Sequence, residues 1–257
     1  MPMKFATLCI VLCFITDAYA SDPETIVLGG RLYDKWWTDT QLNPPNSTHP
    51  AYVNGKKSAG ATWRCKECHG WDYRGKDGAY GKGSHYTGIK GIHEASGKPI
   101  KDILVILKNE RHKFGDFLRD KDLEAIASFV SKGQVDMTKW ISYKTKKARG
   151  DSTKGSSNYQ KHCADCHGEK GDALNLAHNK NKTMYIGTIS NKNPWETLHK
   201  IRFGHPGAVM GMQQMLKSMR SGHHHRGMGK MWQAMPPMFG IITTEEQVNI
   251  LTYLQTL

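Results

Sequence analysis

The sequence predicts a helical chain that is divided into two similar halves. The first observation is a C-x-x-C-H motif in each half, Cys65–His69 and Cys163–His167. The second is a glycine-to-tyrosine segment that leads into each motif. The third is an amphipathic helix that closes each half. A repeat of this order in a chain of 257 residues favours two domains rather than one.

The first element, residues 1–20, has the pattern of a cleaved secretory signal peptide. Lys4 precedes an apolar stretch, and Ala18-Tyr19-Ala20 is a small-x-small cleavage site. The stretch is shorter than the roughly 20 apolar residues of a membrane span, so an uncleaved anchor is the less favoured alternative. We expect export to the periplasm, or to the lumen of an internal respiratory compartment that uses the same signal.

The first domain is expected over residues 21–138. Gly29 and Tyr33 lie on its opening segment, and a proline- and glycine-rich loop insert of about 36–63 then delays the motif. A glycine-rich loop follows the motif, and a helix starts at Pro99. The closing helix is expected to have Asp120 as its N-cap, and its apolar stripe is Leu123, Ile126, Ala127 and Val130.

Residues 139–154 are rich in lysine and read as a basic linker, with a partner-docking segment as the alternative. The second domain is expected over residues 155–257, where the segment Gly155–Tyr159 runs almost directly into the motif. A helix begins at Pro194, with Asn193 as its cap. Thr243 and Glu246 form a capping box for the last helix, whose stripe is Ile250, Tyr253, Leu254 and Leu257.

The spacing C-x-x-C-H is that of covalent c-type haem attachment, in which two thiols bond the haem and the histidine binds its iron. We therefore expect two covalently bound haem c groups. Removal of residues 1–20 leaves four of the six cysteines, and the motifs account for all of them. A pair of zinc or disulfide sites is the alternative, and zinc would need unrelated histidines as further ligands. The expected attachment residues are Cys65, Cys68, Cys163 and Cys166, and the expected proximal ligands are His69 and His167.

The order of glycine and tyrosine, C-x-x-C-H motif and closing helix resembles class I cytochrome c domains. The tandem arrangement resembles the dihaem cytochromes of the cytochrome c4 and thiosulfate-dehydrogenase-like types. The resemblance covers nearly all of the chain after residue 20. It implies an all-α fold of two tandem domains, each wrapped round one covalently attached haem.

The second ligand of each iron decides whether small molecules can bind there. In the second half, Met235 precedes a proline, as the distal methionine of class I domains does, and Met210 and Met238 are its rivals. Aligning the closing helices of the two halves places His112 at the corresponding position of the first half. His85, His93 and Met137 remain alternatives, as does a five-coordinate first haem.

A second insert, of about 208–234, is rich in methionine and contains three consecutive histidines. Thioether and imidazole groups are ligands for copper, so a copper-binding loop is one reading. Methionines at helical spacing favour instead a short helix that packs flexible side chains against the haem or a partner.

The formal net charge of +13 favours redox partner proteins with acidic docking surfaces, or an anionic membrane surface. Export and haem argue against nucleic acid as the partner. We expect an exported carrier of single electrons, from a bis-histidine first haem to a His/Met second haem, rather than an enzyme. A thiosulfate-dehydrogenase-like enzyme and an electron-transfer subunit of a larger respiratory complex are the alternatives. The sequence predicts no oligomeric state.

Overall fold

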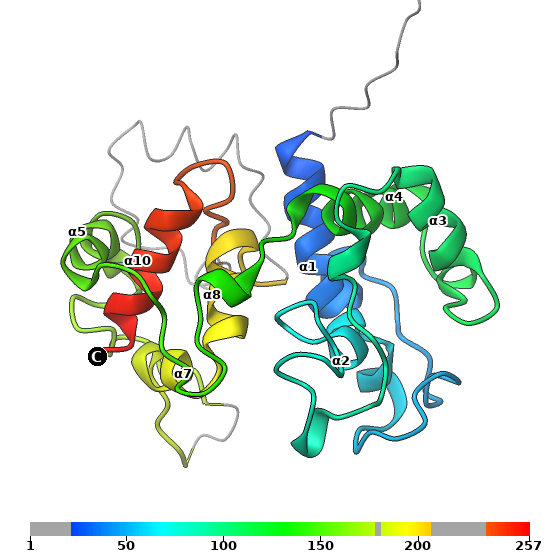
Figure 1. Ribbon diagram of the computed structural model, residues 1–257, viewed down its shortest axis with the longest axis horizontal. Coiled ribbons are helices and arrows are strands. Elements are labelled where there is room, and N and C mark those ends of the chain that lie inside the picture. The colour runs from blue at the N-terminus through cyan, green and yellow to red at the C-terminus, as the bar shows by residue number, and fades with distance from the viewer. Residues whose placement is uncertain (1–21, 178–180, 207–234) are drawn as a thin grey trace, which may run out of the picture.

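The computed structural model describes residues 22–177, 181–206 and 235–257, and these residues form helices and no strand (Figure 1). The prediction that the chain is helical is thereby confirmed for this part of it. The expected signal peptide, the methionine-rich insert and Met210 lie outside the described residues. Among the described helices, none combines the length and the apolar character that crossing a membrane requires.

The first half begins with a long helix and continues through short helices joined by loops. Its α-helices are α1 (Pro23–Thr40), α2 (Cys65–His69), α3 (Ile100–Lys108) and α4 (Asp120–Ser128). Single turns of tighter or wider helix are Ala59–Trp63, Gly83–His85, His93–Ala95, Phe114–Asp116, Phe129–Gly133 and Met137–Lys139.

Three of the expected boundaries in the first half were wrong. The helix expected to start at Pro99 begins at Ile100, with Pro99 as its N-cap. The insert begins later than expected, because α1 continues to Thr40, past the kink at Lys35. The N-cap of α4 is Arg119, whereas Asp120 is the first helical residue. An acidic side chain in the first turn still interacts favourably with the helix dipole, which explains why Asp120 resembled a cap in sequence.

The second half contains α5 (Ser152–His162), α6 (Ala164–His167), α7 (Ile186–Lys192), α8 (Pro194–Phe203) and α10 (Thr244–Leu254). The predicted Asn193 cap, with proline at the first helical position, and the Thr243–Glu246 capping box are both confirmed. One of the four residues of the predicted apolar stripe was wrong: Leu257 lies beyond the end of α10 and is 43% exposed.

In each half the opening helix crosses the closing helix at a glycine. Helix α1 packs along α4, and α5 packs along α10. A Cβ atom at Gly29 would overlap the carbonyl oxygen of Ala125, and one at Gly155 would overlap the carbonyl oxygen of Asn249. Only glycine allows the two backbones to come this close, so the same residue type sits at the same crossing twice.

One helical turn after this glycine, a tyrosine ties the crossing to the C-x-x-C-H motif. The hydroxyl of Tyr33 donates to the carbonyl oxygen of Gly70 at 2.6 Å, and that of Tyr159 donates to the carbonyl oxygen of Gly168, also at 2.6 Å. Gly70 and Gly168 each follow the histidine of a motif directly. The repeated sequence pattern therefore corresponds to one repeated set of contacts.

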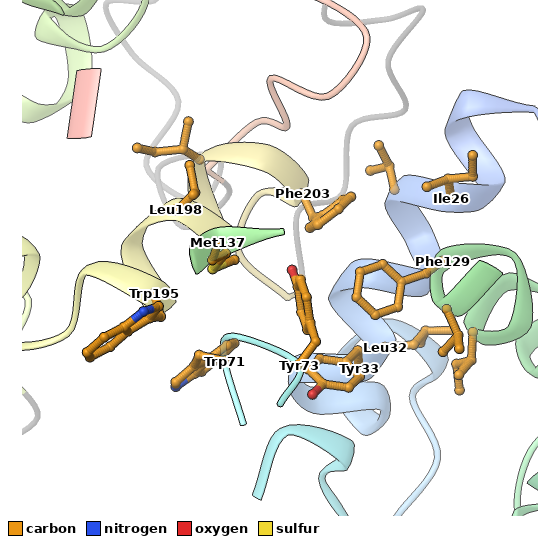
Figure 2. Close-up of a cluster of buried hydrophobic side chains, with 14 of the residues drawn as sticks. Ile26, Leu32, Tyr33, Trp71, Tyr73, Phe129, Met137, Trp195, Leu198 and Phe203 are labelled. Atoms are coloured by element: carbon orange, nitrogen blue, oxygen red, sulfur yellow. The ribbon is translucent and has the colours of Figure 1, made fainter. Parts of the chain in front are cut away.

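The two halves share a continuous hydrophobic core rather than a thin interface. Figure 2 shows Trp195, Leu198 and Phe203 of α8 in the same cluster as Trp71 and Tyr73 of the first half. His199, between these α8 residues, is buried and bonds the first half through both ring nitrogens. Its Nε2 lies 2.9 Å from the carbonyl oxygen of Gly30, and its Nδ1 lies 2.8 Å from the hydroxyl of Tyr73.

Substituting the crossing glycines tests this packing. Gly29→Ala and Gly155→Ala should each lower the free energy of unfolding by about 1–3 kcal/mol, because the added methyl group overpacks a backbone contact. Chemical denaturation measures the change. Gly115→Ala is the control, since its Cβ would meet only Lys108, the flexible side chain at 3.3 Å and the backbone no closer than 3.8 Å. A gain in stability at Gly155, which helix propensity alone would predict, would contradict the close crossing.

His199 should make stability depend on pH. Burial lowers the pKa of His199 to about 4, although Asp34 and the Gly30 carbonyl favour the charged form and Lys200 and Arg202 oppose it. The unfolded chain takes up this proton near pH 6.5, so stability is full above that pH and is lost as pH falls towards 4. Between pH 7 and pH 5 the loss should be about 2 kcal/mol. His199→Gln, which does not titrate, should show a smaller loss in urea unfolding at the two pH values, and an equal loss would exclude His199 as the cause.

Candidate functional site

Each C-x-x-C-H motif forms a short helix, α2 over Cys65–His69 and α6 over Ala164–His167 with Cys163 as its N-cap. All four thiols are free in the structure. Burial, together with the neighbouring thiol, raises the pKa of Cys65 and of Cys163 to about 12. Burial and the charge of Glu67 raise the pKa of Cys68 to about 12. The thiols are therefore protonated in the protein at neutral pH, and nothing in the fold pairs them as a disulfide.

One ring nitrogen of His69 is left free of the backbone hydrogen bond that the other makes. Its Nδ1 lies 2.7 Å from the carbonyl oxygen of Lys90, which accepts the proton on that nitrogen. The hydrogen bond leaves Nε2 with its lone pair, the form in which histidine binds a metal. Burial also lowers the pKa of His69, which keeps the ring neutral.

The ring of His112 lies opposite that of His69. The two ring centroids are 6.3 Å apart and the ring planes meet at 17°. The Nδ1 of His112 lies 3.2 Å from Oδ1 of Asn109, and the ring also bonds the backbone of Ile106. Burial, and next to it the charge of His69, lowers the pKa of His112 to about 4. Two imidazoles with lowered pKa values therefore lie near each other, and one of them belongs to the C-x-x-C-H motif.

The spacing of these rings suits one metal between them. An imidazole nitrogen binds a metal at about 2 Å, so the two rings, with centroids 6.3 Å apart, would hold one metal by each turning a nitrogen towards it. The side chains present therefore fit a haem iron held by His69 and His112, with Cys65 and Cys68 at the edge of the group. The assignment of these four residues to a haem remains a prediction.

The rivals of His112 lie in other environments. His85 bonds Oε2 of Glu67 through Nδ1 at 3.1 Å and stacks on Tyr80, with ring centroids 4.5 Å apart. Met137 is fully buried in the core that the two halves share. His93 lies beside Tyr73, whose carbonyl oxygen accepts from its backbone N–H at 3.0 Å. Of these residues, His112 is the one whose ring contacts that of His69.

His49, in the insert of the first half, supports the loop that carries His112 and was missed by sequence reasoning. The N–H of Ala51 donates to Nδ1 of His49 at 3.1 Å, so the ring proton resides on Nε2. That nitrogen lies 3.2 Å from the carbonyl oxygen of His112. Trp63 packs on the His49 ring edge to face, with centroids 4.4 Å apart. No local spacing signals this role, because His49 and His112 are far apart in sequence.

The attachment helix of the first half rests on a buried group of charges. Burial raises the pKa of Glu67, but hydrogen bonds from His85 and Lys66 outweigh burial and lower it to about 2. Arg64 pairs with Asp34 of α1 and approaches Glu67 at 3.8 Å. These contacts join the start of α2 to α1, and the bond from Tyr33 to Gly70 joins the end of α2 to α1. The cysteines of the first half are thus held on a rigid base.

The second half brings fewer of its predicted residues together. Nδ1 of His167 is buried and has no hydrogen-bond partner among the described residues. Met235 is half-buried, and its carbonyl oxygen accepts from the N–H of His205 at 3.2 Å. Met238 is buried in the core. Among the described residues, no ring contact or hydrogen bond joins His167 to Met235, so the choice of Met235 as ligand remains a prediction.

Several buried polar groups have no hydrogen-bond partner among the described residues. Two of them, one from each half, are the hydroxyl of Tyr80 and the indole Nε1 of Trp195. A buried donor without an acceptor costs about 1–3 kcal/mol, so such groups are usually satisfied by a ligand or water. Both donors suit the carboxylates of a haem. They were not singled out in the sequence, because burial without a partner is visible only in the fold.

Comparison with known proteins adds no family to this picture. No model of a known protein family matches the chain, and no curated protein matches it significantly. Among residues 22–177, 181–206 and 235–257, no group of three or more His, Cys, Asp or Glu side chains is arranged to hold a metal ion. The histidine-rich part of the second insert, where copper was considered, lies outside the described residues.

Replacing His49 tests its support of the His112 loop. His49→Leu should expose residues 109–114 to faster hydrogen exchange, because the loop loses its bond from the insert at a cost of about 1–2 kcal/mol. Amide hydrogen exchange followed by mass spectrometry measures this. His49→Gln keeps an N–H donor and should remain close to the wild-type rate. Equal acceleration in both variants would show that ring packing, not the hydrogen bond, holds the loop.

Proposed function

We propose that this protein is an exported dihaem c-type cytochrome that carries single electrons between respiratory oxidoreductases. The observation that carries the proposal is the pair of near-parallel rings of His69 and His112, 6.3 Å apart beside two free thiols. The same C-x-x-C-H sequence in the second half, with the same tyrosine-to-glycine bond behind it, supports a second group there.

Bound haem supplies one-electron chemistry by cycling its iron between the ferric and ferrous states. The chain would contribute the attachment thiols and the neutral imidazoles. Two protein ligands on one iron leave no open position for a substrate, and this favours a carrier over an enzyme. The resemblance to tandem class I cytochromes c points the same way.

The proposed ligand sets of the two halves differ, His69 with His112 in the first and His167 with Met235 in the second. A thioether ligand favours ferrous iron relative to a second imidazole, so the second haem should have the higher reduction potential. Electrons would then enter at the first half and rest on the second. The shared core around His199 and Tyr73 keeps the two groups at a constant separation.

Low-temperature electron paramagnetic resonance with near-infrared magnetic circular dichroism of the oxidised holoprotein tests the proposal. We expect two low-spin haems, one with the bis-histidine signature and one with the His/Met signature. His112→Ala should convert only the bis-histidine signal to high spin, while Met235→Ala should change only the other. A wild-type protein with a high-spin haem that shifts on addition of a small anion would favour an enzyme instead.

Potentiometric titration of the same holoprotein tests the proposed direction. The His/Met signal should be reduced first as the applied potential falls, because its ferrous state is the better stabilised. The His112→Ala variant identifies which optical change belongs to the first half. Reduction of the bis-histidine haem before the other would contradict the direction of transfer.

A further inference from the structure

The lysine-rich segment between the two halves is a folded turn rather than a loose linker. Ile141 and Ala148 pair as an isolated bridge, and the N–H of Ser142 donates to the carbonyl oxygen of Lys147 at 3.0 Å. The N–H of Arg149 donates to the carbonyl oxygen of Trp140 at 2.8 Å, which closes the base. We refer to residues 139–149 as the basic turn.

The basic turn is fixed to both halves of the protein. The hydroxyl of Tyr143 donates to Oδ2 of Asp72, in the first half, at 2.6 Å. Nζ of Lys147 donates to Oδ1 of Asn191 of α7 at 2.8 Å. Gln255, after α10, accepts from the N–H of Ala148 and donates to the carbonyl oxygen of Lys146. The charged side chains are therefore presented on a rigid support.

The turn exposes positive charge without any acid of its own. Residues 138–150 contain no Asp or Glu. Of the neighbouring acids, Asp72 is buried, Asp136 pairs with Arg74 at 3.0 Å, and the exposed Asp151 caps α5. Exposed cations of the turn and of the adjacent end of α7 are Lys139, Lys144, Lys146, Lys147, Arg149 and Lys192.

A half-exposed aromatic ring lies among these cations. Tyr143 is 38% exposed, and its ring stacks on that of Trp195 with centroids 5.4 Å apart. Trp195 is buried, its Nε1 has no hydrogen-bond partner among the described residues, and it lies in the core shared with Trp71 (Figure 2). Tyrosine and arginine are enriched among the residues that dominate the binding energy of protein interfaces, and the surrounding lysines add charge that steers an acidic partner.

We propose that the basic turn, together with Lys192, is the surface on which an acidic redox protein docks. This rests on the proposed function and adds to it the place and chemistry of the partner. Complementary charge would steer the partner to the point where the halves meet, and the stacked rings of Tyr143 and Trp195 connect that surface with the core. A lipid surface suits the turn less well, because Ile141 is buried and the hydroxyl of Tyr143 points inward, which leaves little apolar surface to insert.

The test compares two triple variants of equal charge. Lys144→Gln/Lys146→Gln/Lys147→Gln alters the turn, while Lys98→Gln/Lys101→Gln/Lys121→Gln alters exposed lysines in the first half. Oxidised plastocyanin, an acidic blue-copper protein, serves as the probe for the ferrous holoprotein in stopped flow. At an ionic strength of about 20 mM the turn triple should react roughly ten-fold more slowly than wild type, and the control within about two-fold. The difference should vanish at high salt.

Two further measurements distinguish loss of charge from disturbance of the turn, and docking from electron transfer. Lys139→Gln/Lys144→Gln removes charge from side chains that make no described hydrogen bond, so it should slow the reaction even if the triple disturbs the turn. Calorimetric titration with redox-inert, cadmium-substituted plastocyanin measures docking without electron transfer. This measurement therefore tests the docking surface independently of the haem proposal. Absence of haem absorbance in the wild-type protein would contradict the haem proposal alone.

Equal slowing in the two triples would overturn the proposal, because net charge rather than the turn would then set the rate. Vesicles of phosphatidylglycerol and phosphatidylcholine test the lipid alternative by cosedimentation. Loss of vesicle binding in the turn triple, with plastocyanin binding unchanged, would identify the turn as a membrane contact and overturn docking of a protein.

Discussion

The close crossing of the opening and closing helices is the contact on which each half depends. At Gly29 and at Gly155 the backbone of one helix touches a carbonyl oxygen of the other. The tyrosine one turn later then reaches the glycine carbonyl behind a C-x-x-C-H motif. The position of the thiols and of the neighbouring histidine is therefore set by packing that lies outside the site itself. A side chain at either glycine would move the tyrosine and, with it, the motif.

In the first half, further contacts hold the His112 loop and helix α2, and the described residues of the second half show no counterpart. Its insert packs His49 and Trp63 against the loop of His112, and the buried charges of Glu67 and Arg64 hold the attachment helix. A neutral histidine held opposite another is the arrangement expected for an iron with two imidazole ligands. The insert therefore has a physical role in the proposed site, although proline and glycine made it look like an unstructured loop.

The two halves are held together by α8, a helix of the second half that packs into the core of the first. His199 and Arg202 lie on this helix, and each bonds a carbonyl oxygen of the first half, at Gly30 and Gly133 respectively. The basic turn adds bonds on the other side of the junction. A carrier of electrons between two groups needs a constant separation between them, and a shared core supplies it better than a flexible linker. The segment expected as a basic linker, residues 139–154, instead contains the folded basic turn and the start of α5 at Ser152.

The sequence alone determined the features that depend on the local spacing of residues, namely the closing helices, the helix caps and the C-x-x-C-H motifs. Periodic apolar positions identified the closing helices, cap chemistry located Asn193 and Thr243, and the repeated motif identified the thiols and histidines of the candidate site. It also singled out His112 by counting back from the closing helix. Tertiary structure decided the contacts between distant residues: the His69–His112 approach, the support by His49, the bridge at His199 and the folded basic turn. These depend on loops and helices that meet in space, and no local pattern of hydrophobicity or charge encodes such meetings.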